Sequence, residues 1–342
     1  MFHALFYISM SILIQIFLYF LRLFPAEFSS KLSLISIKLL SQIHPFSSKH
    51  LEDNRLKKEL FGLNFPNRIG LAAGLDKEGK YFASLGQLGF GFVEVGTFTP
   101  MPQQGNQYPR IKRINKHKSL INRLGFNNPG INSGIKNISS LKSKYNGLVG
   151  ISIGKNKDTS IECAYKDYLY CLDVAYEVAD YIALNISSPN TENLRNLSSK
   201  KYLENLLYEI NKRALKLSAK YSKYTPLVLK ISPDEDEDAV SSIIETSLKY
   251  KIAGFIVSNT SYVEEENIKG GISGTLLRDK SIKMLKLVNK LNKKKAVIIS
   301  SGGIASKKDL IERDKLGADL FQIYTSFVYD GPKIIEELLS DS

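Results

Sequence analysis

The sequence predicts an α/β protein, a closed (β/α)8 barrel preceded by a helical extension. Short apolar runs alternate with helical stretches from residue 66 to the end, as in a parallel sheet with crossover helices. There are eight such runs, which is the strand number of a closed barrel, whereas a doubly wound sheet more often stops at about five to seven. The composition, 43% apolar and 24% charged, is that of an ordinary globular protein.

The chain opens with an apolar run over residues 4–24, in which Arg22 is the only charge. The run is long enough to span a bilayer. A secretory signal peptide would have Lys or Arg before the apolar stretch, and residues 1–5 contain neither. Because positive residues follow the run, we expect the remainder of the chain to stay on the cytoplasmic side.

A second helix is predicted over residues 26–43, after Pro25. Its apolar residues recur at spacings of three and four, which is typical of an amphipathic helix: Phe28, Leu32, Ile35, Leu39 and Ile43. We expect both helices to contact the membrane, and the alternative is a helix pair buried against the main domain. The expected division is therefore 1–45 for apolar, membrane-contacting helices, 46–65 for a linker and 66–342 for the barrel.

The barrel elements follow in order along the chain. The eight predicted strands are 68–74, 90–97, 148–154, 181–187, 226–232, 254–260, 296–303 and 320–325. The helical stretches between them include 161–180, 200–221, 235–251, 276–294 and 306–316. The segment 98–147 is too long for one crossover, so we expect an excursion over the barrel mouth.

Polar residues gather where these strands end, and barrel enzymes carry their chemistry at that face. The pair Gly302-Gly303, with Tyr324-Thr325 after the last strand, is typical of a phosphate site, although either glycine could serve a turn. Lys230 lies within an apolar strand, where a lysine is either paired or functional. Lys77 follows the first strand, and its alternative is a solvated loop lysine.

Charge, cysteines and histidines limit the classes of function. The net charge of +13 favours an anionic partner or simply reflects a lysine-rich surface. Cys163 and Cys171 are too few for a disulfide framework, and their spacing fits packing on one helix face. His117 is the last of four histidines, so neither a Ser-His-Asp triad nor a metal site is expected in the barrel.

Several motifs together resemble one family, dihydroorotate dehydrogenase, over about residues 55–340. They are AAGLDK (72–77), INRLGFNNPG (121–130), IGKNKD (153–158), NISSPNT (185–191), KISPD (230–234), SNT (258–260), GGISG (270–274), SSGGI (300–304) and QIYTS (322–326). The soluble class has a cysteine base at the position where this chain has Ser188. That serine and the helical extension indicate the quinone-dependent, membrane-associated class 2.

The resemblance implies a TIM barrel that binds FMN and oxidises (S)-dihydroorotate to orotate in pyrimidine biosynthesis, with Ser188 as the catalytic base. It implies FMN contacts from Ala73, Gly74, Leu75, Asp76, Lys77, Thr97, Ser152, Asn185, Lys230, Ser258, Gly274, Gly303, Tyr324 and Thr325. Substrate contacts are implied for Lys77, Asn122, Arg123, Leu124, Gly125, Phe126, Asn185, Asn190, Asn259 and Thr260. The expected partners are a membrane quinone and the bilayer, without nucleic acid, for a monomer at the cytoplasmic face of the inner membrane.

The chain departs from the family pattern at three points. Ser152 stands where many relatives have a flavin-contacting asparagine, and Ser258 stands where threonine is common. Glu192-Asn193 replaces a frequent Pro-Gly, which affects the active-site lid.

Two other flavin-dependent barrel enzymes are disfavoured by features that the sequence lacks. A dihydrouridine synthase should carry a catalytic cysteine and an RNA-binding domain, and neither is visible. A hydroxy-acid oxidase needs a histidine late in the barrel, and there is none. A membrane-tethered, non-catalytic flavin or phosphate binder is disfavoured by the presence of Ser188, Lys77 and Lys230.

Overall fold

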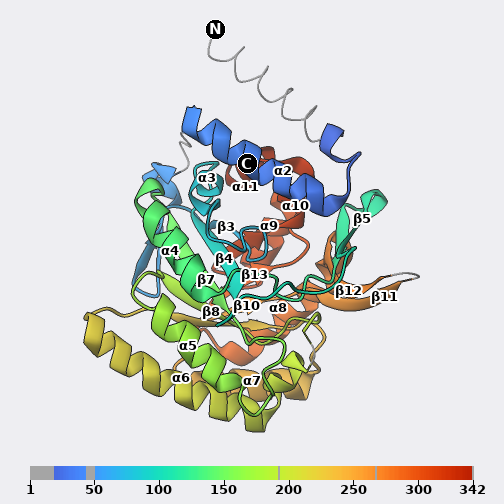
Figure 1. Ribbon diagram of the computed structural model, residues 1–342. Helices are drawn as coiled ribbons and strands as arrows, with labels where there is room; N and C mark the ends of the chain where they lie inside the picture. Colours follow the sequence, from blue (N-terminus) through green and yellow to red (C-terminus); the bar gives the residue numbers. More distant parts are fainter. Residues whose placement is uncertain (1–18, 44–50, 192, 266–267, 341–342) are drawn as a thin grey trace.

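The computed structural model describes residues 19–43, 51–191, 193–265 and 268–340. Eight parallel strands form a closed barrel whose order around the ring follows the sequence, and β14 pairs with β3 to close it (Figure 1). The strands are β3 (Ile69–Leu71), β4 (Phe92–Phe98), β7 (Leu148–Ile153), β8 (Tyr181–Asn185), β9 (Leu227–Ile231), β10 (Gly254–Val257), β13 (Val297–Ser301) and β14 (Leu320–Ile323). The predicted barrel and its eight strand positions are confirmed.

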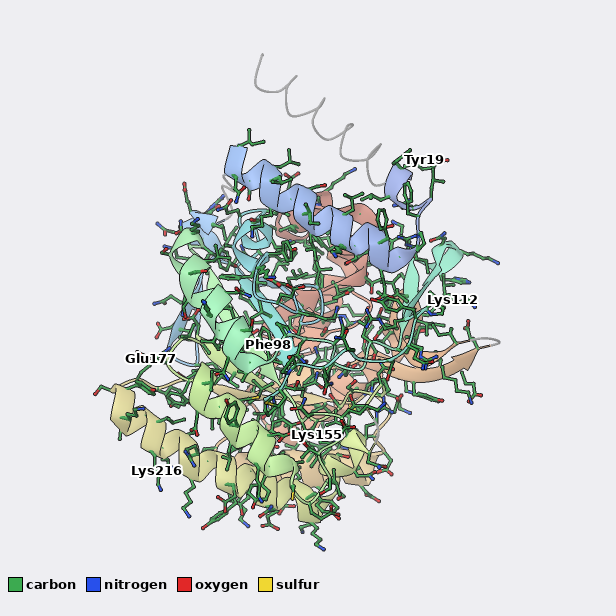
Figure 2. All side chains as sticks on the ribbon, in the orientation of Figure 1. Tyr19, Phe98, Lys112, Lys155, Glu177 and Lys216 are labelled. Carbon is green, nitrogen blue, oxygen red and sulfur yellow. The ribbon has the colours of Figure 1, made fainter. Side chains whose placement is uncertain are left out.

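Helices surround the barrel and bury their apolar faces against it. They are α3 (Phe82–Gly86), α4 (Ile131–Leu141), α5 (Ala164–Ala175), α6 (Lys200–Tyr221), α7 (Glu237–Lys249), α8 (Arg278–Asn292), α9 (Lys307–Lys315), α10 (Thr325–Asp330) and α11 (Lys333–Leu339). Short 3-10 turns occur at Asn54–Leu56, Asn115–His117, Lys142–Lys144, Leu194–Ser198 and Thr275–Leu277. Figure 2 shows Phe98 inside the body of the molecule and Lys216 on the outer side of α6.

The N-terminal end of the barrel is closed by a hairpin. Strands β1 (Lys58–Leu60) and β2 (Leu63–Phe65) pair antiparallel, and the Phe65 ring meets that of Phe92 at 5.4 Å between centroids. Both rings are fully buried, together with Tyr181 at the start of β8. We expected a linker over 46–65, but residues 58–65 form this hairpin, whose apolar side chains cover the N-terminal end of the barrel.

A second sheet lies beside the other end of the barrel. Strands β5 (Ile111–Ile114), β6 (Ser119–Asn122), β11 (Ser261–Glu265) and β12 (Ile268–Gly274) form it in the order β11-β12-β6-β5. The excursion expected within 98–147 therefore joins a hairpin that follows β10. Leu120 of β6 and Ser273 of β12 line the same cavity as the barrel strand ends, so this sheet borders the mouth.

The amphipathic helix is present as α2 (Ala26–Ile43), with the predicted bounds, across the top of the view in Figure 1. Its buried residues are Ser29, Leu34 and Ser41, whereas Leu39 is 54% and Ile43 82% exposed. The apolar stripe of α2 therefore faces mostly outward, and Leu34, off that stripe, packs into the core.

Polar contacts hold the N-terminal segment on the barrel. Glu27 pairs with Arg110 at 2.8 Å, and Arg22 donates to the carbonyl oxygen of Tyr329 at 2.6 Å. Most of the apolar run 4–24 lies outside the described residues. Within the described part of the chain, no helix has the length and apolar character needed to cross a membrane.

The two cysteines do not share a helix face. Cys171 is buried in α5, but Cys163 precedes the helix at its N-cap position and is exposed. The spacing of eight residues predicted a shared helix face, but α5 begins at Ala164, so Cys163 is not part of the helix.

Candidate active site

A cavity with about 1250 Å³ of empty space, partly open to solvent, lies at the C-terminal mouth of the barrel. Nineteen of the residues predicted for the site line it: Ala73, Gly74, Lys77, Thr97, Asn122, Leu124, Gly125, Phe126, Asn185, Ser188, Asn190, Lys230, Ser258, Asn259, Thr260, Gly274, Gly303, Tyr324 and Thr325. They come from distant parts of the chain, and the strand ends bring them together.

Four predicted residues do not line this cavity. Asp76 is buried behind it and accepts the backbone N–H groups of Tyr81 and Phe82, both at 2.7 Å, so it fixes the loop that presents Lys77. Ser152 is buried and hydrogen-bonded to Thr97 at 2.9 Å. Leu75 packs in the core, and Arg123 borders a separate depression beside Asn106.

The floor of the cavity holds a buried pair of opposite charges. Lys230 Nζ lies 3.9 Å from Glu94 Oε1, and the two side chains are 7% and 0% exposed. Glu94 Oε2 accepts hydrogen bonds from Tyr181 Oη at 3.0 Å and Gln322 Nε2 at 2.9 Å. Sequence reasoning missed Glu94, although a charged residue inside the apolar run FVEV gives the same signal as Lys230.

Asparagine amides form the wall beside the second sheet. Asn259 Nδ2 donates to Asn185 Oδ1 at 3.2 Å, and Asn185 Nδ2 donates to Thr97 Oγ1 at 3.0 Å. Asn190 Nδ2 donates to Asn122 Oδ1 at 2.9 Å. These bonds fix the direction of each amide, so the wall presents a set arrangement of donors and acceptors to a planar ligand.

Ser188 follows β8 and is 7% exposed, with its Oγ accepting the Asn190 N–H at 3.3 Å. The nearby Thr191 hydroxyl is buried and has no hydrogen-bond partner among the described residues. The polar groups that follow β8 are thus withdrawn from bulk water. Asn193 has a φ of 57°, and Glu192, the other half of the altered lid pair, lies outside the described residues.

Lys77 is a further cation that lines the cavity. Burial, with a further contribution from Arg110, lowers the pKa of its ammonium group to about 8. Glu27 of α2 opposes this shift. Lys77 therefore carries a positive charge at neutral pH but loses it in mildly alkaline solution.

One end of the cavity is a cradle of backbone rather than side chains. Gly274, Gly302 and Gly303 line it with φ angles of 86°, 98° and 75°. A Cβ on Gly303 would stand 2.5 Å from the Arg278 Cα atom, so only glycine fits. Such a surface lets a ligand group reach the peptide N–H groups directly.

The chain is similar to curated proteins along most of its length. A family model described as dihydroorotate dehydrogenase matches residues 55–341. The dihydroorotate dehydrogenase (quinone) of Buchnera aphidicola subsp. Schizaphis graminum is 47% identical over 285 residues, which cover 81% of this chain and 84% of that protein. The protein of the same name from Acinetobacter baylyi is 45% identical over 286 residues, covering 82% and 85%.

Solved structures agree with these relatives. A crystal structure of DHODH from Eimeria tenella in complex with ferulenol has a TM-score of 0.83 and 31% identity, covering 90% of this chain and 89% of that one. The ligand-free form from the same organism gives 0.81 and 32%, covering 90% and 92%. The family match, the identities and the barrel together show that this chain belongs to the dihydroorotate dehydrogenase family, in its quinone-dependent class 2.

Proposed function

We propose that this enzyme oxidises (S)-dihydroorotate to orotate with FMN as its resident cofactor and a membrane quinone as the final oxidant, in de novo pyrimidine biosynthesis. The observation that carries the proposal is the cavity itself. It combines a backbone cradle at one end, Lys230 on its floor, directed asparagine amides on one wall and Ser188 beside them.

The cavity fits FMN by the chemistry of its lining. The cradle at Gly274 and Gly303, with Thr325 nearby, suits a phosphate group, and Ala73, Gly74, Thr97, Ser258 and Tyr324 would contact the remainder of the cofactor. Bound FMN supplies a ring that accepts a hydride. Lys230 would place its positive charge beside the flavin ring and so favour hydride acceptance. Leu75, Asp76 and Ser152 do not line the cavity, so they would support the cofactor site indirectly, by holding the residues that do line it.

The substrate site is proposed to lie along the amide wall. Asn122, Asn185, Asn190 and Asn259 would match the donor and acceptor edge of the pyrimidine ring, with Thr260 and the backbone of 124–126 beside them. Lys77 would bind the carboxylate. Arg123 lies outside the cavity, so its expected role is to hold the segment that carries Asn122.

Ser188 is proposed to take the C5 proton of dihydroorotate. A serine hydroxyl is a weak base, so the proton must pass onward as it is accepted. The described part of the chain offers no histidine beside it, so the unpaired Thr191 hydroxyl, or a water held there, would relay the proton onward to solvent water. Enclosure of this step from bulk water requires the loop around Asn193 to be closed.

The N-terminal region is proposed to serve the quinone. A lipid-soluble oxidant must reach the cavity from the membrane, and the exposed apolar stripe of α2 provides a surface for that contact. Residues 1–45 would form this membrane-associating part, and 66–342 the catalytic barrel. The proposed location is the cytoplasmic face of the inner membrane, with the protein acting as a monomer.

Flavin colour tests the proposal directly. The purified protein should be yellow, contain about one FMN per chain and bleach when dihydroorotate is added without oxygen. Its colour should return when a quinone is added. A protein that contains FMN but is not bleached by dihydroorotate would contradict the proposed substrate, and a protein that cannot be loaded with FMN would contradict the cofactor.

A further inference from the structure

Arg313 of α9 is a fully buried arginine directly behind the glycine cradle, at 0% exposure. Its Nη1 donates to Ser300 Oγ at 2.9 Å, and its Nη2 donates to Ser281 Oγ at 2.8 Å. The same Nη2 donates to the carbonyl oxygen of Gly302 at 2.6 Å. The guanidinium is therefore joined to the cradle through a backbone atom.

The charge of Arg313 has no carboxylate hydrogen-bonded to it among the described residues, and its Nε has no partner there. Asp309 and Glu312, on the same helix, pair instead with Arg278. Burial lowers the pKa of Arg313 only to about 10, so it stays positive at neutral pH. A buried cation without a hydrogen-bonded carboxylate is costly, and a further anion nearby would add to the partial compensation that Asp309 and Glu312 provide.

The peptide between Gly302 and Gly303 connects this cation to the cavity. It is not among the cis peptides of the chain, so its C=O and N–H point in opposite directions. The carbonyl accepts hydrogen bonds from Arg313 and from Ser281 Oγ, the latter at 2.7 Å. The N–H of Gly303 is therefore turned away from Arg313. Hydrogen bonds on the carbonyl also polarise the peptide and make that N–H a stronger donor.

We propose that Arg313 is a positioning residue for a phosphate ester, which it orders through the Gly302–Gly303 peptide and favours by its buried charge. The inference rests on the proposed function, in which the phosphate is that of FMN. Arg313 itself does not line the cavity, so it acts on the ligand only through the peptide and the electrostatic field. Its contribution should therefore depend on the phosphate and not on the flavin ring.

FMN and riboflavin provide the matched pair of ligands, since they differ only by the phosphate. The full-length apoprotein is titrated with each flavin, and binding is followed by the quenching of flavin fluorescence. Arg313→Gln should weaken FMN binding by about 10–100-fold, as for loss of a charge-assisted contact, and riboflavin binding by less than about threefold. Arg313→Lys keeps the charge and should recover most of the FMN affinity.

Two further variants separate this role from packing. Ser281→Ala removes the other donor to the Gly302 carbonyl and should weaken FMN binding by about threefold, without affecting riboflavin. Arg213→Met removes an arginine of α6 that pairs with Asp173 at 2.8 Å and should leave both affinities unchanged. Thermal unfolding of each apoprotein shows that the variants compared are folded.

The possible results are distinct. Equal losses of FMN and riboflavin in the Arg313 and Ser281 variants would overturn the inference, because they would assign Arg313 to packing alone. Failure of the wild-type protein to bind either flavin would instead overturn the proposed function. If Arg313→Gln does not fold, Arg313→Lys and Ser281→Ala still decide the question through the ratio of the two affinities.

Discussion

The barrel and helix α2 use apolar residues in opposite ways. In β4, Phe92, Val93 and Val95 are fully buried, and the strand is surrounded by protein on all sides. In α2, Phe28, Leu39 and Ile43 are exposed, while Ser29, Leu34 and Ser41 are buried. Apolar residues thus mark a core in one region and an uncovered surface in the other. This difference suggests that chemistry resides in the barrel and contact with the lipid phase in the helix.

The largest effect should come from the chemical step in the barrel. Ser188→Ala should slow the reduction of FMN by dihydroorotate by about 10²–10⁴-fold, the usual contribution of a positioned base. Ser188→Cys should retain part of the rate, with a lower pH optimum. Single-turnover absorbance measurements give this rate, and reoxidation by quinone should not change. Flavin reduction at the wild-type rate in Ser188→Ala would remove Ser188 from the mechanism.

One substitution made in both regions tests the comparison through stability. Phe92→Ala, at 0% exposure, should lower the free energy of unfolding by about 3–5 kcal/mol, because it leaves a cavity in the core. Phe28→Ala, at 54% exposure, should change it by less than about 0.5 kcal/mol. Denaturant unfolding of the two apoproteins provides the values. Similar losses in both variants would mean that the α2 stripe is covered in the native protein.

The dependence of activity on pH should reflect a charge interaction between α2 and the barrel cavity, because Glu27 of α2 acts on Lys77. Because the pKa of Lys77 is about 8, kcat/KM for dihydroorotate should fall by roughly tenfold per pH unit above that value, as the proposed partner of the carboxylate loses its charge. Glu27 of α2 raises the pKa of Lys77, so Glu27→Gln should move this decline to lower pH. Lys77→Arg should move it to higher pH. An unchanged profile in both variants would show that another group controls the decline.

The smallest effect is expected on membrane binding. Leu39→Ser should weaken binding to phospholipid vesicles by about 3–10-fold, since part of one apolar side chain no longer enters the interface. Leu215→Ser on α6 is the control, because this leucine is similarly exposed, at 59% against 54% for Leu39, but lies outside α2. Flotation of each variant with vesicles measures the bound fraction. A loss of the same size in both variants would argue against a specific role for α2.

The sequence was sufficient for the barrel because each strand is a short apolar run that ends in polar or glycine residues. It was also sufficient for α2, whose bounds at Ala26 and Ile43 were as predicted. It did not predict the hairpin at 58–65, because strands of three residues leave little periodic pattern. The direction of the α2 stripe also depends on the surface against which the helix docks.

The missed polar residues have the same explanation. Glu94 stands beside Lys230, and Arg313 behind Gly302, only after the barrel has closed. Their partners are supplied by other strands and helices. Local composition marks Glu94 as unusual in its apolar strand, but Arg313 is one of many charged residues in α9 and carries no such signal. The sequence likewise could not show that Asp76 and Ser152 lie outside the cavity lining, because that depends on how the loops and strands pack in the folded protein.

The closing pair of the barrel has a consequence for biosynthesis. Strand β14 pairs with β3, and beside this seam Arg68 donates to the carbonyl oxygen of Ala318, 250 positions later. The ring therefore cannot close until nearly the whole chain has left the ribosome. Helix α2 emerges much earlier, and at about 5–20 residues per second it precedes β14 by many seconds. During that interval its apolar stripe is available to lipid, so targeting can precede the completion of the catalytic fold.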